Sequence, residues 1–329
     1  MSIARPYPVS DHCDGQRFFN PSPMEHRGLR EILRWKFTSR SVSWPKKIAF
    51  TVPPRPPIRV GDIRATWINH STYLLETPQG NLLTDPVYSP ACGPFGRFGP
   101  SRAHPPGIPF QDLPEIHYVL LSHDHYDHCD LPTLRLLSQV HEPLAITPLG
   151  NGDLLERAGF GRIVELDWWQ NHAPTPNLAI TATPAQHWSN RLSSPRFSRL
   201  WSGFFINAGA ARIYFAGDTG YHPTLFTEIG RRLGPPDFAM IPIGAYEPRW
   251  FMREQHCNPA EAVQIHRDLG ARVSAAMHWG TFHLTDEGRD APPEALRDAL
   301  RTAGLGASDF RIPEPGESIA VSTYSDCLR

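Results

Sequence analysis

The sequence predicts an α/β fold in which helices cover β-sheets, and two observations point to this class. Short apolar stretches typical of strands occupy residues 62–68, 72–77 and 81–85, and a turn at 78–80 joins the last two. Further along the chain, apolar strand-like runs alternate with helix-like segments at 131–139, 259–270 and 292–304, each of which begins at or near a proline. This mixture favours an α/β sandwich over an all-β fold.

The bulk composition is that of a globular chain. Its 329 residues can bury a substantial core, and the hydrophobic (40%) and charged (20%) fractions are ordinary for a soluble protein. No run approaches the roughly 18 apolar residues that cross a bilayer, and the first ten residues lack the apolar core of a signal peptide. The five cysteines are scattered and never form a C-x-x-C pair, which argues against a disulfide framework or a thiolate zinc ribbon. We therefore expect a cytoplasmic protein, with peripheral attachment to a membrane as the alternative.

The first 60 residues differ from the rest in charge. Residues 1–60 carry a formal charge of +7, whereas residues 61–329 carry −8. Segment 28–37 places Leu29, Ile32 and Leu33 on one face of a basic amphipathic helix. Such a helix either lies on an anionic membrane or covers the core of the main domain, and we favour the second because three apolar residues give weak membrane affinity. The proline-rich segment 52–60 reads as a polyproline strap. The sequence thus predicts a basic N-terminal extension (1–60) that packs on a main domain (61–329).

The segment 123–130, HDHYDHCD, contains three histidines and three aspartates directly after the apolar run 118–121. A solvated loop would also use Lys, Glu, Ser and Gly, but this segment uses almost only residue types that bind transition metals or transfer protons. His123 and His125 are two positions apart and point the same way in an extended segment, while Asp127 and His128 follow in the adjoining turn. The segment therefore indicates a metal site.

Three more potential ligands follow apolar, strand-like runs elsewhere in the chain: His187, Asp218 and His278. In layered α/β folds the loops at one end of a sheet form the site, so residues distant in sequence can meet there. Each histidine alone is more often structural, but together with segment 123–128 the set makes coincidence improbable. If one aspartate is shared, seven ligands give each of two ions four protein contacts.

The pattern H-x-H-x-D-H, followed by a distant His, an Asp in GDTG and a late His, resembles the metallo-β-lactamase superfamily. More specific segments, such as ELDWWQ (165–170) and IPIGAYEPRWFM (241–252), are similar to the phospholipase D family that hydrolyses N-acyl-phosphatidylethanolamine. The similarity extends from about Phe19 to Ser318. The resemblance implies a four-layer αββα sandwich with a dinuclear metal site at the sheet edge. It also implies two divalent metal ions, first of all Zn²⁺, with Mn²⁺ and Fe²⁺ as alternatives because His-plus-carboxylate sites accept several metals.

The resemblance also assigns the ligands. It implies that His123, His125 and His187 bind one zinc. Asp127, His128 and His278 would bind the second zinc, and Asp218 would bridge the two.

Further roles follow from the same resemblance. Asp85 would orient a ligand histidine, although its local sequence alone reads as a turn aspartate before Pro86. We expect Asp127, Asp218 and Asp85 to be the carboxylates that catalysis requires. Tyr126 and His256 match positions that contact the phospholipid, but each could instead be structural.

The function expected from this resemblance is hydrolysis of N-acyl-phosphatidylethanolamine-like lipids by a hydroxide that bridges the two metals, giving an N-acylethanolamine and phosphatidic acid. A lactonase or another small-molecule hydrolase of the same superfamily is the alternative, and a non-catalytic lipid-binding protein is disfavoured by the complete ligand set. The acidic main domain argues against a nucleic-acid partner. The expected partners are a phospholipid or other anionic small molecule and a membrane surface, and a homodimer stays open.

Some features near the motifs receive no role. His70 and His283 bring extra imidazoles close to the expected site, and Cys129 is most simply a small buried hydrophobe. The basic, aromatic segment 93–107 corresponds to a loop that varies within the family.

Overall fold

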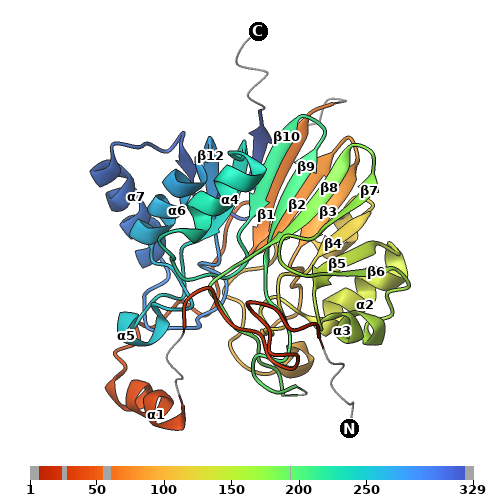
Figure 1. Cartoon of the computed structure of the whole chain (residues 1–329). Coiled ribbons are helices and arrows are strands. Elements are labelled where there is room, and N and C mark those ends of the chain that lie inside the picture. Colours follow the sequence, from red (N-terminus) through yellow and green to blue (C-terminus); the bar gives the residue numbers. More distant parts are fainter. Residues whose placement is uncertain (1–6, 24–27, 55–60, 193, 323–329) are drawn as a thin grey trace.

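The computed structural model describes residues 7–23, 28–54, 61–192 and 194–322. In these residues two mixed β-sheets pack face to face, and helices cover both outer faces (Figure 1). The strand order is β14-β1-β2-β3-β4-β5-β6 in one sheet and β13-β12-β11-β10-β9-β8-β7 in the other. The predicted four-layer αββα sandwich is therefore confirmed.

Among the described residues, each of the two sheets contains seven strands, and most of the helices lie between strands in the sequence. The first sheet contains β1 (Ile63–Asn69), β2 (Thr72–Thr77), β3 (Gly80–Thr84), β4 (Tyr118–Leu120), β5 (Leu144–Pro148), β6 (Ile163–Leu166) and β14 (Ser318–Val321). The second contains β7 (Asn171–Thr175), β8 (Leu178–Thr183), β9 (Gly203–Ala208), β10 (Ala211–Phe215), β11 (Phe238–Pro242), β12 (Val273–Met277) and β13 (Phe310–Arg311). The helices are α1 (Leu29–Thr38), α2 (Leu131–Val140), α3 (Gly152–Arg157), α4 (Leu225–Leu233), α5 (Arg249–Met252), α6 (Pro259–Leu269) and α7 (Ala291–Ala303), with short 3₁₀ turns η1 (Pro94–Gly96) and η2 (Phe110–Asp112).

The strands of the first sheet are apolar on both faces because each face meets a different core. Side chains alternate across a strand, so in β2 Tyr73 and Leu75 pack into the core between the sheets. Leu74 points the other way, into a second core shared with α2 and α3. The continuous apolar sequence of these strands is the pattern expected for a sheet covered on both sides.

Parallel pairing brings the candidate ligands to one edge of the sandwich. Strands β3 to β6 pair in parallel in the first sheet, as do β10 to β13 in the second. The carboxyl ends of parallel strands share an edge. The strands end earlier than the apolar runs predict: β4 ends three residues before His123, and β8 ends four residues before His187. The ligands therefore lie in the loops that follow the strands, and His278 reaches its place with a φ of 60°.

Helix α6 shows how the outer layer is fixed. Asn258 accepts a hydrogen bond from the Glu261 amide (2.8 Å), and the Glu261 carboxylate accepts one from the Asn258 amide (2.9 Å), which forms a capping box. Gly270, in the left-handed region with a φ of 63°, ends the helix. The buried face of α6 packs on β11 and lies between α4 and α7 (Figure 1).

The N-terminal helix forms where the sequence predicts it, but it contacts the body through a different residue. Ile32 and Leu33 are 39% and 45% exposed, so these two side chains are not buried in the core of the main domain. Instead, the Trp35 indole donates to Asp286 (3.0 Å), and its ring packs against Phe251. The division at residue 60 stays a prediction, and most of the proposed strap, residues 55–60, lies outside the described residues.

No helix among the described residues is both long and apolar enough to span a bilayer.

Candidate metal centre

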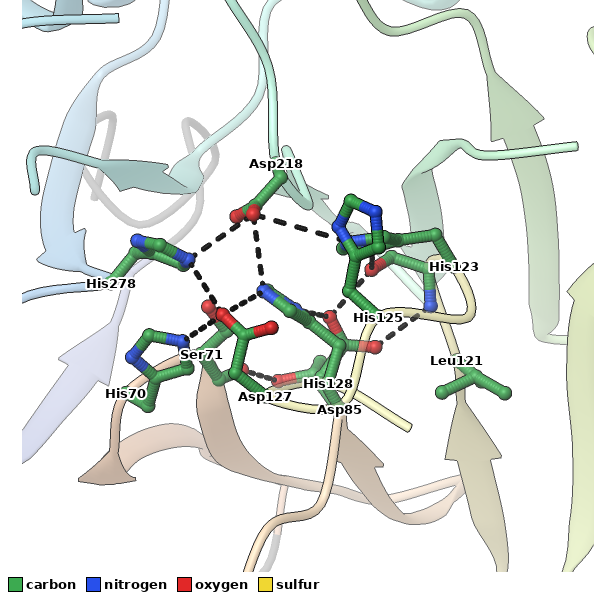
Figure 2. A network of polar contacts seen from close by, with 12 residues as sticks. His70, Ser71, Asp85, Leu121, His123, His125, Asp127, His128, Asp218 and His278 are labelled. Atoms are coloured by element: carbon green, nitrogen blue, oxygen red, sulfur yellow. Dashed lines mark hydrogen bonds and ion pairs between the residues drawn. The ribbon is translucent and has the colours of Figure 1, made fainter. Parts of the chain in front are cut away.

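Three histidines converge at the edge of the sandwich and form the first triad: His123, His125 and His187. The Nδ1 atom of His125 lies 3.0 Å from His123 Nε2 and 3.2 Å from His187 Nε2. His123 and His187 are buried, and His125 is partly exposed. Figure 2 shows His123 and His125 facing each other from the loop after β4.

A second group lies beside the triad and consists of Asp127, His128 and His278. Asp127 Oδ2 is 3.4 Å from His128 Nε2 and 3.3 Å from His278 Nε2. These residues come from different sheets, because His278 follows β12 whereas the other two follow β4. The structure thus brings together the side chains that the sequence assigned to the second ion.

Asp218 lies between the two groups (Figure 2). Its Oδ2 atom is 3.1 Å from His278 Nε2 and 3.2 Å from His128 Nε2. The same oxygen is 3.7 Å from His187 Nε2 and 3.9 Å from His123 Nε2. One carboxylate oxygen is therefore within reach of both groups, as a bridging ligand requires.

Asp85 orients His128 through a hydrogen bond to the ring nitrogen that faces away from the candidate ions. This fully buried carboxylate accepts hydrogen bonds from the Ser122 amide (2.7 Å), the Ser122 hydroxyl (2.6 Å) and His128 Nδ1 (2.7 Å). On the other side of the site, His187 Nδ1 donates to the carbonyl of Gln255 (2.9 Å). Metal-binding histidines are usually oriented in this way by an acceptor on the far ring nitrogen.

These partners determine which ring nitrogens carry protons. A carbonyl or carboxylate oxygen can only accept, so Nδ1 is the protonated atom in His128 and His187. The Ser122 hydroxyl donates to Asp85, so its oxygen is free to accept from His123 Nδ1 at 2.8 Å. In their neutral forms, these three rings all present a lone pair at Nε2.

The lone pairs point at one another and at carboxylates, which is an arrangement that a cation stabilises. The buried atoms His128 Nε2, His278 Nε2 and Asp218 Oδ1 have no hydrogen-bond partner. Buried polar atoms are nearly always paired, so atoms that have no partner and lie among other acceptors are suited to bind a cation. The residues present therefore fit divalent metal ions.

The electrostatics of the triad favour metal binding. Burial lowers the pKa of His123 well below its usual value, that of His125 to about 3, and that of His187 to about 4. These rings are neutral at physiological pH, and the neutral imidazole is the form that binds metals.

The second group shows the same demand for positive charge. Although burial opposes ionisation, His128 holds the pKa of Asp127 and of Asp218 well below the usual range. Conversely, burial disfavours a charged His128, but Asp218 and Asp127 raise its pKa well above the usual value. Two ionised carboxylates thus attract a cationic group to this spot.

The profile of the Beta-lactamase superfamily domain matches residues 80–279, more than half of the chain. The chain belongs to this superfamily. N-acyl-phosphatidylethanolamine-hydrolyzing phospholipase D 1 of Caenorhabditis elegans is 34% identical over 310 residues, which cover 87% of each protein. An uncharacterized protein of Mycobacterium tuberculosis is 39% identical over 306 residues, which cover 90% of this chain and 79% of that one.

Solved structures support the same fold. The isothiocyanate hydrolase from Delia radicum gut bacteria has a TM-score of 0.62 at 20% identity, covering 78% of this chain and 98% of its own. Family membership, these relatives and the candidate His/Asp site together make this beta-lactamase superfamily member a metal-dependent hydrolase.

His70, to which the sequence assigned no role, contacts the second group. His70 Nε2 donates to Asp127 Oδ2 (2.9 Å), and the His70 carbonyl accepts from the His278 amide (2.9 Å). The ring centroids of His70 and His278 are 4.1 Å apart. His70 thus touches the second group twice, and its place directly after strand β1 was the only sequence signal for it.

The other two aspartates of the motif turn away from the ligands. Asp124 is buried and accepts from the Asn190 amide (2.9 Å), with Arg199 3.6 Å away. Asp130 accepts from Ser89 and Thr133. Both carboxylates therefore hydrogen-bond to neighbouring segments of the chain and are not candidate metal ligands.

The remaining predicted residues lie at or near the centre. His256 Nδ1 is 3.9 Å from Asp218 Oδ2, and the ring is mostly buried. Tyr126, within the motif, is partly exposed, with the Arg191 guanidinium 4.0 Å from its ring centroid. Their contact with substrate stays a prediction. Cys129 is fully buried in the second core, as expected, and His283 faces away, 3.0 Å from the hydroxyl of Ser41.

Proposed function

We propose that this protein is a zinc-dependent phosphodiesterase of the phospholipase D type. It hydrolyses N-acyl-phosphatidylethanolamine-like lipids to an N-acylethanolamine and phosphatidic acid. The observation that carries the proposal is the convergence of all seven motif side chains in a chain that aligns over 87% of its length with an enzyme named for this activity. A yeast protein with the same activity in its name is 35% identical over 258 residues.

The substrate class follows from charge. The phosphodiester of such a lipid is an anion, and two divalent cations would outweigh the two carboxylates, Asp127 and Asp218, that face them. Bound ions would supply hydroxide at neutral pH and offset the charge that builds on the phosphate oxygens. Water attacks phosphorus, the bond from phosphorus to the ethanolamine oxygen breaks, and the alcohol leaves with a proton.

The chain's own residues prepare this reaction by fixing geometry. Asp85 keeps His128 in the tautomer that presents Nε2, and Gln255 does the same for His187. Asp218 Oδ2 lies within 4 Å of a histidine of each group, 3.2 Å from His128 Nε2 and 3.7 Å from His187 Nε2. Tyr126 and His256 border the centre, and we propose that they contact the lipid headgroup.

The test uses purified protein whose metal content has been measured. It is supplied with N-acyl-phosphatidylethanolamine in ¹⁸O-labelled water and, separately, with a sugar-phosphate lactone. We expect zinc at about two equivalents, release of N-acylethanolamine, and ¹⁸O in the phosphate of phosphatidic acid.

Two variants complete the design. Asp218→Ala should abolish hydrolysis, while Asp298→Asn, on the exposed surface of α7 with 68% side-chain exposure, should not change it. Turnover of the lactone alone would establish the rival hydrolase instead. No turnover of either substrate by zinc-loaded protein would favour a binding protein.

A further inference from the structure

The loop at residues 91–101 exposes two aromatic side chains to solvent. Phe95 is 78% exposed and Phe98 is 61% exposed, and the exposed Arg97 lies between them. An isolated exposed apolar residue is ordinary, but two large aromatic rings within four positions at one loop tip are not.

The loop is built to hold these rings outward. Its ends pair through Ala91 and Ser101, and the Cys92 amide donates to the Pro100 carbonyl (3.0 Å). Phe95 has a φ of 59°, in the left-handed region that a bulky residue rarely adopts. A Cβ on Gly93 or Gly96 would overlap the Phe98 carbonyl or the Ser89 hydroxyl, so both positions need glycine. Backbone strain of this kind is typical of functional segments.

The base of the loop is connected to the candidate metal centre through two intervening side chains. The Arg102 guanidinium donates to the carbonyls of Ser89 and Val87 (2.9 Å each) and lies over the Phe282 ring. The Phe282 ring packs edge-on against His70 at 5.2 Å, and His70 donates to Asp127. A continuous series of side-chain contacts, from Arg102 through Phe282 and His70 to Asp127, therefore joins the base of this loop to the candidate site.

We propose that Phe95 and Phe98 insert into the surface of an anionic lipid bilayer and thereby present the metal centre to membrane-embedded substrate. This inference rests on the proposed function, because a lipid substrate requires such contact. Residues 86–111 contain no Asp or Glu, and Arg97 at the tip suits anionic headgroups. Two Phe side chains bury at most about 500 Å², and a stable protein interface needs about 800 Å² from each partner. The patch thus fits a membrane better than a second copy of the chain.

The test measures co-sedimentation of full-length, metal-loaded protein with vesicles of phosphatidylcholine, with and without phosphatidylglycerol. Neither lipid is the proposed substrate, so binding is read independently of hydrolysis. We expect stronger binding to the phosphatidylglycerol vesicles and a loss of about tenfold or more in the Phe95→Ser/Phe98→Ser variant. Arg97→Gln should weaken binding only to the anionic vesicles.

Phe37→Ser is the comparison variant, because Phe37 is 84% exposed but belongs to α1, the basic helix whose alternative role was to lie on an anionic membrane. It should leave vesicle binding unchanged, and thermal melting should show that all variants are folded. Unchanged binding by the double variant, or an equal loss in the Phe37 variant, would overturn the proposal. A double variant that loses only self-association in sedimentation velocity would show that the loop joins two copies of the chain.

The two proposals fail separately. Vesicle binding that depends on Phe95 and Phe98 without any lipid hydrolysis would sink the proposed function alone. Hydrolysis of a short-chain, water-soluble N-acyl phosphodiester that is equal in wild type and double variant, with no vesicle binding by either, would sink the membrane contact alone.

Discussion

Replacing Asp85 by asparagine keeps the size of the side chain but removes one acceptor. In the wild type, both oxygens of Asp85 accept, one from the Ser122 amide and the other from the Ser122 hydroxyl and His128 Nδ1. If the new amide nitrogen faces His128, then Nδ1 must accept and the ring proton moves to Nε2. If it faces the Ser122 amide instead, two N–H donors collide. The first orientation removes the acceptor of the Ser122 hydroxyl and the second removes the acceptor of the Ser122 amide, so either costs a hydrogen bond at a fully buried position.

The size of the effect follows from that one bond. A hydrogen bond to a charged group contributes about 1.5–3 kcal/mol, and the free energy of unfolding should fall by about that amount. With its proton on Nε2, His128 cannot bind a metal ion, and loss of such an orienting partner typically weakens metal affinity by about 10–100-fold. Because His123 is held through Ser122, which remains in place, we expect the first triad to keep its ion longer than the second group.

The assay is metal content after dialysis against graded chelator, combined with denaturant unfolding of the metal-free protein. Asp130→Asn is the matched control, because Asp130 is also buried and accepts from Ser89 and Thr133 but touches no candidate ligand. Both variants should lose stability, but only Asp85→Asn should lose metal. Equal metal retention in the two variants would refute the orienting role of Asp85.

Three more outcomes follow from the same structure. His70→Ala should weaken zinc binding by about tenfold, because Asp127 loses a donor, while His70→Gln should recover part of the affinity; equal zinc titrations would contradict this. Chelation should lower the thermal midpoint as well as activity, because a ligand of the native state stabilises it, and zinc should restore both. Burial opposes a charged His12, but Asp167, 2.7 Å away, raises its pKa in the folded protein. The stability that protonated His12 contributes is therefore complete below the unfolded pKa of about 6.5 and is lost as pH rises through the higher folded value. The difference in unfolding free energy between wild type and His12→Gln should shrink with rising pH.

The sequence predicted the strands and helices well because their signals lie in a few adjacent residues. Each of the seven segments whose bounds were predicted from the sequence, three strands and four helices, is present, with every end within one residue of its prediction. Apolar runs, turns and helix-starting prolines are properties of a few adjacent residues, and the sheet or helix forms around them.

The parts that the sequence missed depend on tertiary contacts. Leu33 looked like a core residue because a helix needs an apolar face, but Trp35 makes the contact with the body and Leu33 stays exposed. His70 carries no spacing pattern that links it to the motif, so only the fold shows that it reaches Asp127. Asp124 lies inside the motif, yet its carboxylate serves the loop that holds Asn190.

The candidate ligands come from both halves of the sandwich, with His123 to His128 from one sheet and His187, Asp218 and His278 from the other. An ion held by both halves would act as a non-covalent staple that closes very long stretches of chain. Closing such stretches costs entropy that the native packing must overcome. The sandwich should therefore come apart more slowly when the staple is in place, and metal supply during synthesis should influence how much protein reaches its native form.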